Sequence, residues 1–304
     1  MNNLMIKYIC TISFLVVSFL GHGQDLLTKL EKEYPKKPVY ELATFKTTRL
    51  GLGHSIETRK KGALEISLFN SFWNHKNSNE EKKLIDKISM RFGLNYAITN
   101  NFTIGAGYTN FDEISDGFIK YKILKQQKNN YKAPVSIVLF QGFSHRNKNE
   151  YERNLYANDV LINSNIFSAT SQILIAKKFN QKFSAQISPT YIHRNKLFFT
   201  NQPKDQFALG FGGRYKVGGH LSLISEYYYT LNPITSVDNY NPFMVGVNWE
   251  LSHLLLQFKM TNTRHFVEDA FITQTQNKFN FNDGNFHFGF HAIFVLHTKK
   301  NKLE

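Results

Sequence analysis

A histidine–serine pair and two well-spaced histidines are the residues whose types could most directly do chemistry. His54 and Ser55 could supply the base and the nucleophile of a hydrolase. Adjacent side chains of an extended segment point apart, however, so these two would not hydrogen-bond to each other. The chain also contains no Gly-x-Ser-x-Gly motif. We therefore expect no catalytic residue and no enzyme, and a hydrolase at the rim of a membrane protein is the weakest alternative.

His287 and His291 could suggest a metal site, since they would point the same way along a strand. Four residues of extended chain separate them by about 13 Å, however, which is too far for both to bind one ion. Partners from other strands would be needed, and the sequence does not identify them. We predict no metal site and no cofactor.

The first residues are typical of a secretory signal peptide. Lys7 precedes an apolar run over residues 8–20, and Gly21 and Gly23 are the small residues that a signal peptidase reads. The run is shorter than the roughly 20 residues that a spanning helix needs. Cleavage before Gln24 would also remove Cys10, the only cysteine, and leave no thiol for a disulfide or a nucleophile.

Composition separates the remaining classes of protein. The net charge of +14 is compatible with nucleic acid or with anionic lipid headgroups. The basic residues are scattered along the chain, which argues against nucleic acid as a partner. Aromatic residues make up 15% of the chain, yet the mean hydropathy is −0.35. A chain that is rich in phenylalanine and polar on average is typical of strands in which apolar and polar residues alternate.

Such alternation is clear in several segments. In residues 88–98, for example, Ile88, Met90 and Phe92 alternate with Ser89 and Arg91. Runs of about ten residues are long enough to cross a bilayer at a tilt, and strands of soluble sandwiches are usually shorter. We predict an all-β fold, a closed antiparallel transmembrane β-barrel of about 12 strands. The candidate strands are residues 62–73, 88–98, 102–109, 114–125, 134–145, 166–178, 183–191, 207–216, 220–231, 242–250, 253–262 and 286–296.

The connections between these segments suggest an orientation. Tight turns at 99–101, 180–182, 217–219 and 251–252 alternate with longer polar connections at 74–87, 146–165, 194–205, 232–241 and 263–282. Outer-membrane barrels have short periplasmic turns and long extracellular loops. Pro189 falls inside a candidate strand, so we expect a bulge or a local gap in the ladder there.

The predicted organisation is a signal peptide (1–23), a periplasmic or plug segment (24–60), the barrel (61–298) and a short tail (299–304). The second of these could fold into the lumen, and its candidate plug residues are Phe45, Arg49, His54 and Ser55. The alternative is a simple linker into the first strand. The sequence does not decide between the two.

Several phrases of the chain resemble an uncharacterised family of outer-membrane β-barrels from Bacteroidota-type bacteria, classed as a domain of unknown function. They are TFKTTRL (44–50), GHS (53–55), DGFIKYK (116–122), LIAKKF (174–179), HRN (193–195), FALG (207–210), GRYK (213–216), EYYY (226–229), YNP (240–242), FIT (271–273) and GNFHFGF (284–290). The resemblance covers nearly all of the mature chain. It implies a barrel in the outer membrane and implies no activity.

The inner face of the predicted barrel carries the remaining candidate site. The lumen-lining candidates are Glu65, Arg91, Lys120, Lys122, Arg214, Lys216, Glu226, Glu250, Lys259, His287 and His291. Basic groups outnumber acidic ones, so an open lumen would attract anions. Alternatively, these groups pair across the lumen and simply fill it.

We therefore predict an outer-membrane barrel that acts as a channel or gated pore for a small anionic solute. The alternative is a structural or surface-interaction barrel that acts through its long loops at 146–165 and 263–282. The expected partners are outer-membrane lipid, the barrel-insertion machinery and the solute itself, and the sequence predicts no oligomeric state.

Overall fold

The computed structural model describes residues 38–73, 87–111, 113–128, 133–147, 165–197, 202–252, 254–280 and 286–297. The predicted signal peptide, residues 24–37 and the tail at 299–304 lie outside these ranges. Residues 40–127 and 131–304 form one compact unit, and a second unit, 1–39 with 128–130, lies almost entirely outside the described residues. No helix in the described part of the chain is both long and apolar enough to cross a membrane.

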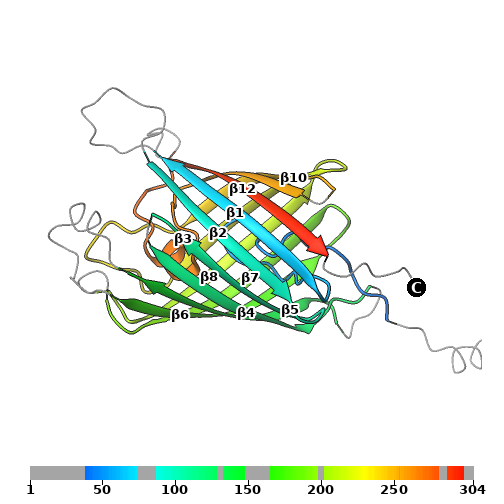
Figure 1. Cartoon of the computed structure of the whole chain (residues 1–304), viewed down its shortest axis with the longest axis horizontal. Helices are drawn as coiled ribbons and strands as arrows, with labels where there is room; N and C mark the ends of the chain where they lie inside the picture. Colours follow the sequence, from blue (N-terminus) through cyan, green and yellow to red (C-terminus); the bar gives the residue numbers. More distant parts are fainter. Residues whose placement is uncertain are drawn as a thin grey trace, which may run out of the picture. The chain divides into compact units, whose positions relative to one another are not determined.

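The larger unit is a closed barrel in which each strand pairs antiparallel with its neighbours in sequence and β1 pairs with β12 (Figure 1). The predicted fold, a closed antiparallel barrel of twelve strands, is confirmed. The strands are β1 (Ala63–Trp73), β2 (Lys87–Ala97), β3 (Phe102–Thr109), β4 (Ile114–Leu124), β5 (Ser136–Arg146), β6 (Ile166–Lys178), β7 (Phe183–Arg194), β8 (Asp205–Lys216), β9 (Leu221–Thr230), β10 (Phe243–Glu250), β11 (Leu254–Thr261) and β12 (His287–His297).

Alternation along each strand separates the two faces of the wall. On β2, Phe92 is 49% exposed whereas its neighbour Arg91 is 1% exposed. Apolar side chains of this kind point outward on every strand, where lipid tails would meet them. Closing the sheet leaves no unpaired edge, as a strand surrounded by hydrocarbon requires.

Pro189 interrupts the ladder between β6 and β7. Pairing runs to Gln172–Thr190 and resumes at Ile175–Ile187, and it skips Ile173–Pro189 and Leu174–Ser188 without changing register. On the other side, Pro189 still pairs with Leu209 of β8. Proline has no N–H to donate, so the missing bond is the one toward β6. The predicted irregularity is therefore a gap and not a bulge.

Two segments outside the strands occupy the lumen. The first, which we call the plug hairpin (residues 44–58), turns back on itself through hydrogen bonds from Leu50 N to the Gly53 carbonyl and from Ser55 N to the Thr48 carbonyl, both 2.9 Å. Its flanks lie at the end of the barrel that carries the short turns. Thr58 donates to the Asn100 carbonyl in the turn at 99–101, and Tyr40 pairs with Gln127, just after β4. This folded-in arrangement is the plug alternative and not the linker.

The second segment, the loop insert (residues 262–275), follows β11 and contains helix α3 (Glu268–Thr273). Every residue of α3 is buried, and the helix packs against β6 and β9 inside the wall (Figure 1). The prediction of a surface loop at 263–282 was therefore wrong for its first half. Phe266, Val267, Phe271 and Ile272 are apolar, and the lumen shields them from water.

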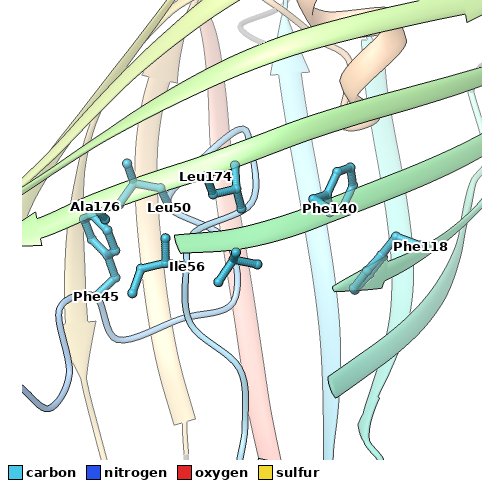
Figure 2. Packing of buried hydrophobic residues seen from close by; sticks show 8 residues of the cluster. Phe45, Leu50, Ile56, Phe118, Phe140, Leu174 and Ala176 are labelled. Carbon is cyan, nitrogen blue, oxygen red and sulfur yellow. The ribbon is translucent and has the colours of Figure 1, made fainter. Parts of the chain in front are cut away.

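The inner face is also less polar than expected. Phe118, Val138, Phe140 and Leu174 point inward and pack with Phe45, Leu50 and Ile56 of the plug hairpin in one buried cluster, in which Ala176 also takes part (Figure 2). A water-filled bore would leave such rings exposed to water. The hairpin is therefore seated by apolar contact as well as by polar bonds.

Replacing Phe140 tests this inner packing. Phe140 is 2% exposed, and its ring centroid lies 5.7 Å from that of Phe118. Phe140→Ala should lower the free energy of unfolding by about 3–5 kcal/mol, as for other large-to-small changes in a core. Urea titration of the folded barrel in detergent measures this. Phe143→Ala, on the same strand but 40% exposed on the outer face, should cost clearly less, and equal losses would contradict the inward packing.

Candidate functional site: the plugged lumen

The tip of the plug hairpin binds a carboxylate of the wall. The backbone N–H groups of Leu52 and Gly53 both donate to Glu226 of β9, the second over 3.2 Å. The Tyr228 hydroxyl donates to the same carboxylate over 3.3 Å. These three donors stabilise a charge that is otherwise buried from water.

Glycine is required at this tip because of the close approach. A Cβ on Gly53 would lie 1.9 Å from the Tyr228 hydroxyl, and one on Gly51 would lie 1.9 Å from the Met244 side chain. On the wall, a Cβ on Gly212 would lie 2.3 Å from the Leu50 side chain. The rigid phenol of Tyr228 leaves no room for a side chain at position 53, whereas the Met244 and Leu50 contacts involve the flexible ends of side chains.

Lys120 of β4 holds the two arms of the hairpin. Its ammonium donates to the carbonyls of Thr48 (3.1 Å), Ser55 (2.6 Å) and Glu57 (2.8 Å). A lysine has three N–H groups, so these three bonds use all of its donors. The buried charge of Lys120 is therefore stabilised by the main chain of the hairpin.

Other wall side chains repeat this pattern. Gln257 donates to the Leu50 carbonyl over 2.7 Å, and Lys259 lies 3.4 Å from the Gly51 carbonyl. Gln186 donates to the His54 carbonyl and accepts from Ile56 N–H. The hairpin is thus bonded to several strands around the wall.

Glu65 of β1 combines wall and hairpin partners. It accepts from Thr48 of the hairpin, from Asn95 of β2 at 2.8 Å, and from Arg59, just after the hairpin, at 2.6 Å. Arg59 is the one ion-pair partner among them. The base of the hairpin is fixed to the wall by this cluster.

The two inserts meet inside the barrel at Arg49. Its guanidinium donates to the carbonyls of Leu52 (2.8 Å) and Phe266 (2.9 Å), and it lies 3.3 Å from the Glu268 carboxylate. Both members of this ion pair are almost fully buried. Burial lowers the pKa of Arg49 and raises the pKa of Glu268, and in each case the partner's charge acts in the opposite direction.

His54 lies beside this ion pair. Its ring centroid is 4.3 Å from that of Phe118 and 4.5 Å from that of Phe140, and Nε2 lies 3.7 Å from Glu268. Burial is the main reason that the pKa of His54 lies well below its usual range, and the charges of Arg49 and Lys120 lower it further. His54 is therefore neutral while the hairpin is in place.

The loop insert has its own anchors. Arg194 of β7 donates to the Asp269 carbonyl over 2.8 Å and to the Thr273 hydroxyl over 2.6 Å. Ser144 of β5 donates to the Asp269 carboxylate over 2.9 Å. These contacts hold α3 from the side of the barrel that carries the longer loops.

All the lumen-lining candidates named from the sequence lie on inward-facing positions of the strands. Some pair with other charges, as Arg91 does with Asp116 and Arg214 with Glu250 (2.9 Å). Lys120 and Glu226 bond to the hairpin backbone instead. The sequence allowed two alternatives, a net basic lumen and charged groups that pair and fill it. Each alternative describes part of the wall. Whether these residues act on a solute stays a prediction.

The structure also locates the histidine and serine residues that the sequence suggested for chemistry. His287 and His291 face inward and are buried, and the His291 ring packs 4.1 Å from that of Phe69. Ser55 is fully buried and donates its hydroxyl to the Thr47 carbonyl. In the described part of the chain, no group of three or more His, Cys, Asp or Glu residues could hold a metal ion.

Sequence reasoning missed four inward charges, namely Asp116, Arg146, Lys178 and Arg194. Asp116 has the same parity on its strand as Lys120, so alternation could have identified it. Arg146 and Arg194 end β5 and β7 and face inward. They were assigned to loops because the alternation weakens near strand ends.

Removing one member of the Arg49–Glu268 pair should destabilise the closed lumen. Arg49→Met would leave a buried, unpaired carboxylate, which typically costs about 3–5 kcal/mol. The double variant Arg49→Met with Glu268→Gln should recover a large part of that loss. Urea unfolding of the single and double variants gives the coupling energy, and additive effects would show that the pair is not coupled.

Several solved structures are similar to this chain. Among solved structures, the chain is similar to the COG4313 outer membrane channel from Pseudomonas putida F1, with 13% identity over 79% of this chain and 98% of that chain and a TM-score of 0.48. It is also similar to the KdgM porin (9% identity, 77% and 99% covered, TM-score 0.46) and the NanC porin (6%, 77% and 100%, 0.44). At these identities the likeness concerns the fold alone.

No curated protein matches the sequence. Residues 45–296 match the model of a family described as "Membrane bound beta barrel domain (DUF5777)". That range begins within the plug hairpin and ends in β12, so the matched unit includes both lumen inserts. The bacterial group suggested by the sequence stays a prediction. Because the match spans most of its length, the chain belongs to the DUF5777 family of membrane-bound β-barrel domains.

Proposed function

We propose that this protein is a gated channel for a small solute, with the plug hairpin as its gate. The observation that carries the proposal is the material that fills the lumen. Barrels of about eight strands are filled by their own side chains, whereas this wider wall is filled by two segments that do not belong to it. A segment that enters from one end and is held by side-chain bonds can leave without breaking the ladder of the wall.

The chemistry of the closed state suits such a movement. Lys120, Glu226 and Gln257 bond to the hairpin through groups that water can equally satisfy. The net contribution of one such bond is modest, about 0.5–1.5 kcal/mol for neutral partners and about 1.5–3 kcal/mol for charged ones. Water entering the lumen would replace these bonds as the hairpin leaves.

An open lumen would favour anions. The inward basic residues outnumber the acidic ones at described positions. The basic residues are Arg91, Lys120, Lys122, Arg146, Lys178, Arg194, Arg214, Lys216 and Lys259, and the acidic residues are Glu65, Asp116, Glu226 and Glu250. Rings of basic side chains select for anions in pores. We therefore propose a small anionic solute.

The cellular setting follows from the predicted signal peptide. We propose that the chain is exported, loses residues 1–23 and is inserted by the barrel-insertion machinery into a bacterial outer membrane. The termini of the barrel and the tight turns would then face the periplasm. In that orientation, the plug hairpin closes the lumen from the periplasmic side.

A structural barrel is the second candidate, and the filled lumen itself favours it. Its contacts would come from the connection at 146–165, because the first half of 263–282 is buried in the lumen. No catalytic step is part of either proposal. His54 and Ser55 are fully buried, and Ser55 is bonded to the main chain.

Displacing the hairpin tip should open the channel. In Gly53→Val, the added carbons would collide with the Tyr228 hydroxyl, so the tip should no longer seat on Glu226. Conductance of the purified protein in planar bilayers should rise at least tenfold over the wild type. The reversal potential in a salt gradient should show a preference for anions.

Gly218→Ala is the matched control, because a Cβ at Gly218 meets nothing within 4 Å. It should conduct like the wild type. Deletion of residues 24–60 gives an independent route to the same open state. If Gly53→Val and the deletion both fold and both remain silent, the gate is refuted and the structural barrel is favoured.

Protonation of His54 should favour release of the hairpin. His54 is held neutral in the closed lumen, whereas a hydrated histidine has a pKa of about 6.5. The released hairpin therefore binds a proton more readily, and linkage favours release by up to about tenfold per pH unit below 6.5. Bilayer conductance compared at pH 7.5 and 5.5 measures this.

Charged groups around His54 either strengthen or oppose the pH dependence of hairpin release. Arg49, Lys120 and Arg91 disfavour its charged form in the closed state. Burial raises the pKa of Glu268, so the titration of Glu268 acts in the opposite direction. His54→Phe keeps an aromatic ring against Phe118 and should conduct less at pH 5.5, relative to pH 7.5, than the wild type does, because it lacks the protonation that favours release. An unchanged pH response in that variant would assign the effect to another group.

A further inference from the structure

The outer face of the barrel contains a pocket that the lumen does not explain. It has a volume of about 490 Å³ and spans the outer side of β4 to β8, within the roughly 300–1,000 Å³ of ligand pockets. Leu139, Ile173, Tyr191 and Phe207 line it, and each of them is between 38% and 49% exposed. Its position on the wall therefore opens it to lipid and not to the lumen.

The gap in the β6–β7 ladder forms one edge of this pocket. Pro189 and Ile173 line it, and they form one of the two residue pairs that the ladder skips. Position 189 has no N–H to give, so the Ile173 carbonyl loses its cross-strand donor. A carbonyl without a donor in hydrocarbon costs several kcal/mol. A hydroxyl group on a bound molecule could satisfy it.

A polar pair lies beside this gap on the same outward face. Ser171 donates to the Gln141 side chain over 2.6 Å, and the Gln141 amide nitrogen donates to the Gly142 carbonyl over 3.1 Å. An amide nitrogen has two N–H groups, and the second has no partner among the described residues. Polar side chains facing lipid are costly and usually have a function.

The polar pair and the ladder gap lie near the middle of their strands. Gln141 is central in β5, Ser171 in β6 and Pro189 in β7. No residue that lines the pocket carries a formal charge. A charged lipid headgroup resides at the membrane interface, so the ligand that matches this depth carries a neutral polar group on an apolar chain.

We propose that this pocket binds a single-chain amphiphile from the membrane, namely a long-chain fatty acid in its protonated form or the corresponding alcohol. Its chain would lie along Leu139, Ile173 and Phe207. Its hydroxyl would donate to the Ile173 carbonyl, and its oxygen would accept from the Gln141 amide. The surrounding bilayer supplies such molecules directly, and the proposal does not depend on whether the lumen opens.

Photolabelling tests this site. The full-length protein in phosphatidylcholine vesicles is labelled with diazirine-bearing palmitic acid, and labelled peptides are located by mass spectrometry. In the wild type, labelling should saturate and should map to β5, β6 and β7. Unlabelled palmitic acid and hexadecanol should compete at least tenfold more effectively than hexadecane, which lacks the polar group.

Three variants separate the parts of the site. Pro189→Val restores the N–H toward Ile173, and Gln141→Leu with Ser171→Ala removes the polar pair, so each should weaken labelling at least tenfold, about the loss expected for one well-made hydrogen bond. Ser225→Ala removes another outward-facing serine, on β9, and should label like the wild type. Heat-modifiable migration on gels confirms that each barrel is folded.

Several results would overturn the proposal. Labelling spread evenly around the outer face would show that no site exists. Equal competition by hexadecane would show that only the apolar groove is used, by lipid tails in general. Undiminished labelling in folded Pro189→Val would remove the ladder gap from the site.

Discussion

The closed state of this barrel depends on buried wall charges whose partners are the backbone of another segment. Lys120 uses all three of its donors on carbonyls of the plug hairpin, and Glu226 accepts N–H groups from its tip. Neither charge could remain in a dry lumen without these partners, because an unpaired buried ion costs several kcal/mol. The wall therefore requires either the hairpin or water. For the proposed gate, this requirement would distinguish a plugged lumen from an open, hydrated one.

The wall charges can be satisfied either by the hairpin or by water, but the apolar cluster favours the hairpin alone. Phe118, Phe140 and Leu174 point inward and would contact water in an open lumen. Their burial against Phe45 and Ile56 favours the closed state by an amount that scales with the apolar area removed from water. In the proposed gate, polar bonds that water can replace and apolar contacts that it cannot would together set the balance between the plugged and the open lumen. Arg49 lies where both inserts meet, so the position of the hairpin and that of the loop insert are linked through one ion pair.

Most of the wall could be predicted from the sequence because alternation with a period of two determines both the strands and their faces. The weaker alternation in β4 and β5 had a physical cause, since inward Phe118, Val138 and Phe140 make both faces apolar there. The apolar stretch from Phe266 to Ile272 was likewise a signal that its loop is buried. What the sequence could not reveal is which wall residue meets which hairpin atom. In contacts such as that of the Lys120 side chain with the Ser55 carbonyl, one partner is a backbone group. Every residue type has the same backbone carbonyl, so the sequence does not identify such a partner.

Glycine residues make the contacts between the hairpin backbone and the wall side chains specific, because they allow a close approach. Gly53 lies under the Tyr228 hydroxyl, and Gly210 of β8 lies under the Tyr228 ring, where an added Cβ would be 2.4 Å from the ring. Tyr228 therefore fits only between two positions without side chains, one on the plug hairpin and one on the wall. Its hydroxyl reaches Glu226 as a result, and the same carboxylate receives the tip N–H groups. A seat defined this closely leaves little freedom for the tip, so small changes in sequence at these glycines would displace the plug hairpin before they altered the barrel.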